Sequence, residues 1–415
     1  MRPIIEREIV IFLKIRGSLQ FINSIDWKLK MENYIEEIPS YLEKIRSVKE
    51  MILANIVMIG QVPSPTFHEA RRVEVFQERM FEAQVDECTI DEFRNPIGVI
   101  RGTSDKKPPI FVVAHLDTYI DKDIDHNYTI RKDMIHGPGI MDNSAGAAIL
   151  VSLPEILRKL ELQFESDIVI AGLIYSIGKG NLQGIRQLLG AWKTPIRGAI
   201  CVEGGELGRL NYYSDGTRRC EVECKISADD GAEYRFKPNA ILILNEVINR
   251  ILTLRLPQRP RARVIIGKIF GGFKHGIIAL EGTLGFEIQS NSDDMVKTIF
   301  RDITDIVDGL SHEYQVDMKL KTISSVNAST LSFSHPLVKS TVAIMKKLDL
   351  KPKAEPSGSE LSIFLSRKIP AVTLGVSRGH NYHLINAQME IEPMYKGIAQ
   401  IIGVMKAIDS GVCDE

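Results

Sequence analysis

Uninterrupted apolar segments separated by helical patterns constrain the fold of this chain most. Residues 109–115, 167–175, 199–202 and 370–376 are each rich in Val, Ile, Leu and Ala. Such runs are typical of strands that are buried on both faces of a parallel sheet. Between the first two runs, residues 144–162 have the apolar spacing of a helix, which gives the order of a βαβ unit. The sequence therefore predicts an α/β fold.

The pattern changes around residue 216. Residues 217–226 alternate between polar and apolar side chains, as a half-exposed strand does. A helix, two strands, a helix and a strand are then predicted at 239–254, 262–270, 282–290, 293–312 and 314–322. This β-α-β-β-α-β order is that of a ferredoxin-like domain. Because the α/β pattern resumes after residue 325, we expect the small domain, 216–324, to be inserted between two parts of the larger one, 34–215 and 325–415.

Residues 1–33 form an N-terminal extension without a sustained period. A short strand or helix packed on the domain and an incorrectly chosen start codon explain it equally well. Its most apolar stretch, residues 9–13, is shorter than the apolar core of about 7–15 residues in a signal peptide or the about 20 residues of a membrane span. We therefore expect a soluble protein with no membrane partner.

Composition excludes two further classes of protein. The 52 Lys and Arg residues against 53 Asp and Glu residues leave a net charge of −1, so no electrostatic attraction to nucleic acid is expected. The 5 cysteines are odd in number and scattered, which indicates reduced thiols in the cytoplasm rather than a disulfide framework.

Histidines and carboxylates stand where the buried strands are expected to end. His115 ends the first strand, Asp142 lies in a glycine-rich turn that opens the following helix, and Glu203 ends the third strand. His383 comes a few residues after the last strand, and Asp117 follows His115 by two positions. Open α/β sheets bind ligands beyond the carboxyl ends of their strands, so these side chains are expected to meet.

Each of these residues alone is more often a structural hydrogen-bonding group than a metal ligand. Two histidines with two carboxylates at strand ends change that balance, because such mixed sets suit zinc or a similar divalent ion. A carboxylate two residues after His115 can orient its ring through the second ring nitrogen.

These features resemble the co-catalytic zinc amidohydrolase and peptidase family that includes aminoacylase, succinyl-diaminopimelate desuccinylase and bacterial glutamate carboxypeptidase. The H-x-D strand end, the G-x-G-x-x-D turn at 137–142, the segment 238–241, the paired glycines at 271–272 and the strand 369–376 match in order and spacing. The resemblance runs from about residue 38 to the C-terminus. It implies a zinc-peptidase-like mixed sheet flanked by helices, with the inserted domain as lid and dimerisation surface of a homodimer.

The resemblance also implies roles for individual residues. His115 would bind one zinc ion and Asp142 would bridge two. Glu203 would complete the first metal's ligands, and His383 would belong to the second metal. Asp117 would orient His115.

The chain departs from the family directly after the strand that ends at Tyr175. The family has two consecutive glutamates there, a general base and a ligand to the second metal. This chain has Ser176 and Ile177 instead. Isoleucine offers no lone pair to a metal, and serine near neutral pH is a poor proton acceptor without a base of its own.

Further departures fall in the lid and in a later signature. Ala232 stands where the family has a histidine, and Gln289 where an arginine commonly grips the substrate carboxylate. Gly276 takes the place of an asparagine, unless His275 replaces it. The G-[ST]-x-D signature becomes Gly358-Ser-Glu-Leu361, which lacks the final Asp.

The first hypothesis is therefore a degenerate peptidase, with hydrolysis of peptides or N-acyl amino acids lost or strongly impaired. Loss of a general base costs roughly 10²–10⁴ in rate, and loss of a donor to the intermediate costs about 10²–10³ more. The resemblance alone leaves open whether the protein is an enzyme.

Two alternatives remain open. One is an active hydrolase of a dipeptide or acylated amino acid, with a single metal on His115, Asp142 and Glu203 and a substitute base. At most one metal site is expected, or none. Glu206 is considered as that base, against a solvated loop carboxylate, and Lys179 as a cation that neutralises Asp142 and Glu203, against an exposed turn lysine. The other alternative is an interaction module that acts through the lid.

Overall fold

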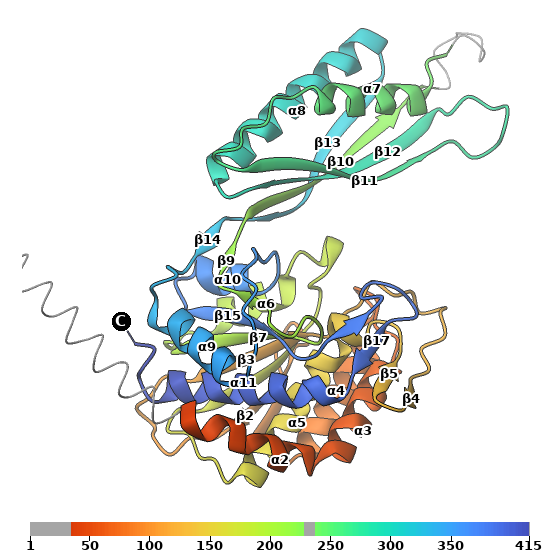
Figure 1. Cartoon of the computed structure of the whole chain (residues 1–415). Helices are drawn as coiled ribbons and strands as arrows, with labels where there is room; N and C mark the ends of the chain where they lie inside the picture. Colours follow the sequence, from red (N-terminus) through yellow and green to blue (C-terminus); the bar gives the residue numbers. More distant parts are fainter. Residues whose placement is uncertain (1–34, 228–236, 415) are drawn as a thin grey trace, which may run out of the picture.

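The computed structural model describes residues 35–227 and 237–414 of this chain of 415 residues. The predicted N-terminal extension and Ala232 lie outside these residues. Figure 1 shows a larger α/β domain and, connected to it by two extended strands, a smaller domain with its own sheet and two helices.

The α/β domain contains a seven-stranded mixed sheet. Its strand order is β1 (Glu87–Ile90), β2 (Pro96–Ile100), β6 (Ile168–Leu173), β3 (Ile110–His115), β7 (Gly198–Glu203), β15 (Ala371–Gly375) and β8 (Leu210–Asn211). The four central strands, β6, β3, β7 and β15, are parallel and almost completely buried. They are the four apolar runs of the sequence, so the predicted α/β fold is confirmed.

Helices cover both faces of this sheet. One face packs on a core formed with α2 (Tyr41–Arg46), α3 (Lys49–Gly60), α4 (Ala70–Glu82), α5 (Ala145–Leu160), α9 (Pro336–Lys347) and α11 (Glu392–Asp409). The other face packs on α6 (Gln183–Ala191) and α10 (Leu361–Ser366). The turn η1 (Ile38–Ser40) precedes α2. Because alternate residues of each central strand enter the two cores, uninterrupted apolar runs are required.

Within the described residues, the segment Ile140–Leu160 alone is long and apolar enough to cross a membrane. Of its apolar window, 89% is buried inside the protein, as in the core helix of a folded domain.

The smaller domain has the predicted ferredoxin-like order. It consists of β10 (Gly216–Lys225), α7 (Ala240–Leu252), β11 (Ala262–Gly271), β12 (Glu281–Ser290), α8 (Asp293–Tyr314) and β13 (Asp317–Val326). The antiparallel sheet has the order β11-β12-β10-β13, and both helices pack on one of its faces. We refer to these elements as the lid. The short pair β9 (Tyr213–Ser214) and β14 (Ser329–Thr330) lies where the chain enters and leaves it.

A second four-stranded sheet lies beside the carboxyl ends of the central strands. It joins β16 (Gly379–His380), β17 (Gln388–Glu390), β5 (Met134–His136) and β4 (Thr129–Arg131). It therefore connects the segment before Asp142 to the segment that carries His383.

Arg72 on α4 fixes the helix layer against the loops at the strand ends. The guanidinium is buried and donates hydrogen bonds to the carbonyl oxygens of Val62 and Leu116, both at 3.0 Å, and to Ser144 Oγ at 3.2 Å. Burial lowers the pKa of Arg72 to about 10, so the group stays charged near neutral pH. Because Leu116 directly follows His115, this hydrogen bond from Arg72 stabilises the backbone at the end of β3.

We expect Arg72→Met to destabilise the fold by about 3 kcal/mol, because it leaves buried carbonyl oxygens without donors at about 1–3 kcal/mol each. Urea denaturation followed by circular dichroism measures the change. Arg71→Met is the matched control, because the Arg71 side chain is 63% exposed and pairs on the surface. An equal loss of stability in the two variants would show that the buried hydrogen bonds are unimportant.

Candidate metal centre

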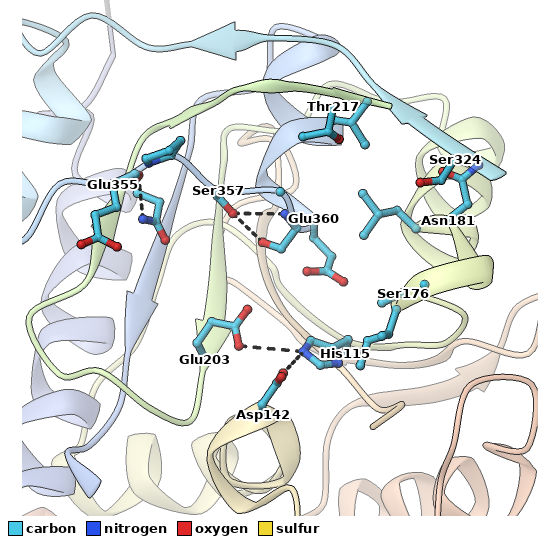
Figure 2. Close-up of a pocket in the computed structure, with 18 of the residues that line it drawn as sticks. His115, Asp142, Ser176, Asn181, Glu203, Thr217, Ser324, Glu355, Ser357 and Glu360 are labelled. Atoms are coloured by element: carbon cyan, nitrogen blue, oxygen red, sulfur yellow. Dashed lines mark hydrogen bonds and ion pairs between the residues drawn. The ribbon is translucent and has the colours of Figure 1, made fainter. Parts of the chain in front are cut away.

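Three of the predicted ligands meet at one edge of the sheet. His115 and Glu203 are the last residues of β3 and β7, which are parallel neighbours, so their side chains emerge together. Asp142 comes from the turn η2 (Ile140–Ser144) that opens α5. The ligand atoms of all three residues lie within 4.8 Å of one another. His115 Nε2 is 3.1 Å from Asp142 Oδ1 and 3.8 Å from Glu203 Oε2 (Figure 2).

Asp117 orients the ring of His115. His115 Nδ1 lies 2.9 Å from the backbone oxygen of Asp117 and 3.5 Å from its carboxylate oxygen Oδ1. Burial disfavours the charged ring, but hydrogen bonds to Asp117, Asp142 and Glu203 outweigh it and raise the pKa of His115 well above its ordinary value. With Nδ1 directed at Asp117, the Nε2 atom faces the carboxylates, which is the orientation a metal-binding histidine needs.

Asn143 holds the two carboxylate-bearing segments together. Its side chain donates to the backbone oxygen of Val202 at 2.7 Å and accepts from the backbone nitrogen of Gly204 at 2.8 Å. These two groups flank Glu203, so one buried amide fixes the spacing between the η2 turn and the end of β7. Gly146 is required beside it, because a Cβ atom there would lie 2.1 Å from Asn143 Oδ1.

The donor set fits a divalent cation. One imidazole nitrogen and two carboxylate oxygens converge at a largely buried site, and three protein ligands with an open side are how catalytic zinc is usually held. Burial disfavours the Asp142 carboxylate, yet His115 and His383 outweigh this effect and hold the pKa of Asp142 below its ordinary value. Asp142 is therefore ionised near neutral pH, as a metal ligand must be.

The structure brings His383 to the second oxygen of Asp142 but to no complete second site. His383 Nδ1 lies 3.5 Å from Asp142 Oδ2, and the side chain is 66% exposed. Ile177, which the resemblance aligns with a further ligand of the family, lines the same pocket without a donor atom. Over the ranges 35–227 and 237–414, a single three-ligand group is present, the one formed by His115, Asp142 and Glu203.

The segment that the resemblance aligns with the paired glutamates of the family is held by Asp117. The backbone nitrogens of Ser176 and Ile177 donate to Asp117 Oδ2 at 3.0 and 2.8 Å, and Thr66 Oγ1 donates to the same atom at 2.8 Å. Ser176 is buried, and its hydroxyl has no hydrogen-bond partner within the described part of the chain. Asp117 therefore contacts both His115 and the segment that carries Ser176 and Ile177.

Lys179 and Glu206, the two residues considered from the sequence as substitutes, are both exposed. Lys179 lies in the turn η3 (Gly178–Gly180), is exposed and forms no ion pair with the described residues, so its position does not support a role in neutralising Asp142 and Glu203. Glu206 lines the pocket but is exposed and bonded to Arg209 Nε at 2.8 Å, which agrees with the solvated loop carboxylate.

Arg209 is the cation beside the carboxylates, and sequence reasoning missed it. Its Nη1 lies 4.0 Å from Glu203 Oε1. Burial opposes its charge, but Glu203 and the other anionic neighbours raise the pKa of Arg209 above its ordinary value. The signal in the sequence was weak, because an arginine six residues after Glu203 has no distinctive pattern.

Glu360, at the start of α10, is a second residue that sequence reasoning missed. It is 2% exposed, and its carboxyl group extends into the pocket toward Ser176 and His115 (Figure 2). Burial raises the pKa of Glu360, Glu203 acts in the same direction, and the charge of His115 and the hydroxyl of Ser176 oppose them. A signal did exist, because this acid stands inside the altered G-[ST]-x-D signature.

A cavity of about 560 Å³ lies between the α/β domain and the lid, and its lining includes His115, Asp142, Glu203, Arg209 and Glu360. The lid contributes Thr217 and Arg219 from β10 and Ser324 and Val326 from β13. The volume lies within the range of roughly 300–1,000 Å³ typical of small-molecule sites.

The remaining departures in the lid lie away from this cavity. His275 and Gly276 are exposed in the loop between β11 and β12. Gln289 on β12 accepts from Arg263 Nε and bonds to Glu287.

Fold and site together define a metallopeptidase-like protein: a parallel sheet with a His-Asp-Glu group at its carboxyl edge and an inserted lid. The chain belongs to peptidase family M20/M25/M40, whose family model matches residues 111–407. No curated protein matches the chain in sequence.

Solved structures share the fold at low sequence identity. Aminopeptidase PepT from Bacillus cereus is 16% identical, with a TM-score of 0.65 over 87% of this chain and 98% of its own. A tripeptidase from Staphylococcus aureus is 17% identical, with a TM-score of 0.69 over 87% of this chain and 99% of its own. The dipeptidase Dug1p from Saccharomyces cerevisiae is 12% identical, with a TM-score of 0.72 over 90% of this chain and 98% of its own.

We expect Asn143→Ala to weaken binding of a divalent metal ion, with zinc as the probe, by about 10–100-fold, the usual cost of losing a group that orients the ligands. Titration of the metal-free protein with zinc in competition with a chromophoric chelator measures the affinity. Asn127→Ala is the control, because Asn127 is exposed and distant in sequence from every ligand. An unchanged affinity in Asn143→Ala would show that the amide does not set the spacing of Asp142 and Glu203.

Proposed function

We propose that this protein is a one-metal hydrolase of amide bonds in small peptides or N-acylated amino acids, much slower than a two-metal enzyme. The observation that supports it most is the buried group of His115, Asp142 and Glu203, which faces a cavity of about 560 Å³. The similar solved structures include an aminopeptidase, a tripeptidase and a dipeptidase, which favours a small peptide as substrate.

His115, Asp142 and Glu203 would hold zinc or a similar divalent ion. When bound, the ion supplies a Lewis acid that polarises the scissile carbonyl group. Asp117 keeps Nε2 of His115 turned toward the site. Arg209 offsets part of the negative charge of Glu203. The lid strands β10 and β13 close one side of the cavity and limit the size of the substrate.

A homodimer formed through the lid and a cytoplasmic location are also part of this proposal. The edge strand β11 exposes Ile265, Ile269 and Phe270 at 40%, 44% and 65%. An exposed apolar edge strand is a surface on which a second chain can pair. All 5 cysteines are free, which suits a reducing compartment.

A second candidate function is ligand binding without hydrolysis. The replacement of the paired glutamates by Ser176 and Ile177 favours it, because the expected base and the expected ligand of a second metal are both absent at those positions. In that case the cavity binds a peptide or acylated amino acid and releases it unchanged.

Zinc-supplemented protein is expected to contain one zinc per chain and to hydrolyse a dipeptide or N-acetyl amino acid in a substrate panel. His115→Ala is expected to lose both, since it removes the single nitrogen ligand. Chelation should lower the free energy of unfolding by about 2.7 kcal/mol relative to protein with zinc at 100 times its dissociation constant. Elemental analysis, amine-release assays and thermal unfolding provide the measurements.

His312→Ala is the matched control, because His312 is exposed on α8. Protein that takes up no zinc after supplementation would contradict the proposed function. Protein that binds zinc and hydrolyses nothing in the panel would favour the second candidate.

Charged side chains on β11 are expected to separate the proposed dimer. Ile269→Asp with Phe270→Asp places two carboxylates on the edge strand and should shift the mass measured by light scattering to that of one chain. Phe81→Asp is the control, because Phe81 is 76% exposed on α4 of the α/β domain. A wild-type protein that is monomeric at micromolar concentration would contradict the dimer.

A further inference from the structure

Glu360 is a buried acid whose environment is not explained by packing. It is 2% exposed, and its Oε1 atom has no hydrogen-bond partner among the described residues. The side chain makes no capping hydrogen bond to its own helix, although Glu360 is the N-cap residue of α10. Burying a carboxyl oxygen without a hydrogen-bond partner is costly, and such atoms concentrate at functional sites.

The open oxygen of Glu360 faces the position where the family has its base. Ser176 occupies that position, and its hydroxyl also has no partner in the described ranges. Glu360 and Ser176 line the same cavity as the ligands His115 and Glu203. In Figure 2 the Glu360 carboxyl group extends from α10 into the space above Ser176 and His115.

We propose that Glu360 is the general base of this site and replaces, from a different element of the fold, the acid that is absent at position 176. This inference rests on the proposed hydrolase function. The small side chain of Ser176 leaves room for the Glu360 carboxyl group, so the serine is part of the arrangement rather than only a loss.

The geometry favours a base over a further metal ligand. His115, Asp142 and Glu203 have ligand atoms within 4.8 Å of one another, and no other described acid joins that group. Glu360 is therefore set back from the metal position while still lining the cavity. Glu206, the base considered from the sequence, is bonded to Arg209 and exposed, so it is less suited to accept a proton inside the pocket.

Glu360 transfers one proton from the attacking water to the leaving amine, as the base does in other amide hydrolyses. Glu360 accepts a proton from water as the water oxygen forms a bond to the carbonyl carbon, and the carbonyl oxygen takes up the electron pair of the C=O double bond. The carboxylic acid of Glu360 then gives the proton to the amide nitrogen as the C–N bond breaks and the electron pair on the oxygen re-forms the C=O bond. A carboxylic acid and an amine leave, and Glu360 is again a carboxylate.

Glu360→Gln tests the assignment, because it keeps the size of the side chain and removes the base. We expect kcat to fall by roughly 10²–10⁴, with KM and one zinc per chain unchanged. Glu69→Gln is the matched control. Glu69 is also 2% exposed, but it accepts from the backbone nitrogen of Tyr175 at 3.1 Å, a bond that glutamine can keep. Its kcat should stay at the wild-type value.

Two further variants guard against a folding defect. Glu360→Asp keeps the charge and withdraws it by one methylene, so kcat should fall less than in Glu360→Gln. Ser176→Glu added to Glu360→Gln returns an acid to the family's position and should restore part of kcat. Such a rescue requires a folded, zinc-loaded protein and cannot arise from repair of a structural role.

The outcomes separate this inference from the proposed function. Wild-type turnover with an unchanged kcat in Glu360→Gln overturns the base and leaves the hydrolase standing. Loss of zinc in folded Glu360→Gln also overturns the base, because Glu360 would then be a ligand. A zinc-loaded wild-type protein that hydrolyses no substrate in the panel overturns both.

Discussion

The site depends on the pairing of β3 and β7 as parallel neighbours. That pairing places His115 and Glu203 at the same edge of the sheet, where their side chains lie side by side. Two charged groups so close inside a protein must be fixed and electrically balanced, since unpaired buried charges are strongly destabilising. Asp117 fixes the imidazole ring, Asn143 fixes the backbone on either side of Glu203, and Arg209 lies near its carboxylate.

The sequence predicted the features that repeat along the chain. The central strands were recognised because each of their residues enters one of two cores and must be apolar, which leaves a continuous run. His115 and Glu203 were then placed correctly, since each directly ends such a run. The lid followed from its order of elements, and strand alternation in residues 217–226 reflects a sheet with helices on one face only.

Local sequence patterns could not predict how segments that are distant along the chain are arranged around the site. Glu360 lines the same cavity as Ser176 because α10 packs on the face of the sheet that also carries α6, and no spacing in the sequence encodes that arrangement. Lys179 is the converse case. It is close to the site along the chain, yet Gly178, Asn181 and Leu182 adopt positive φ angles of 57°, 55° and 56°, and the intervening lysine is exposed. Nearness in sequence was a poor guide where the backbone reverses.

Ser176 and Ile177, the two residues expected to replace acids after β6, have different consequences for the site. A second ion would need Asp142 and a further acid as ligands. Ile177 removes the acid, and the second oxygen of Asp142 lies 3.5 Å from His383, while Glu203 Oε1 lies 4.0 Å from Arg209. His383 and Arg209 thus lie where they can balance the negative charges of Asp142 and Glu203 without a second ion. The acid that the resemblance places at Ser176 has another role, that of a general base. A base needs only a proton-accepting oxygen in this space. Any carboxylate that extends into the space can supply that oxygen. Under the proposed one-metal function, the site is therefore a distinct arrangement with balanced charges rather than an eroded two-metal site.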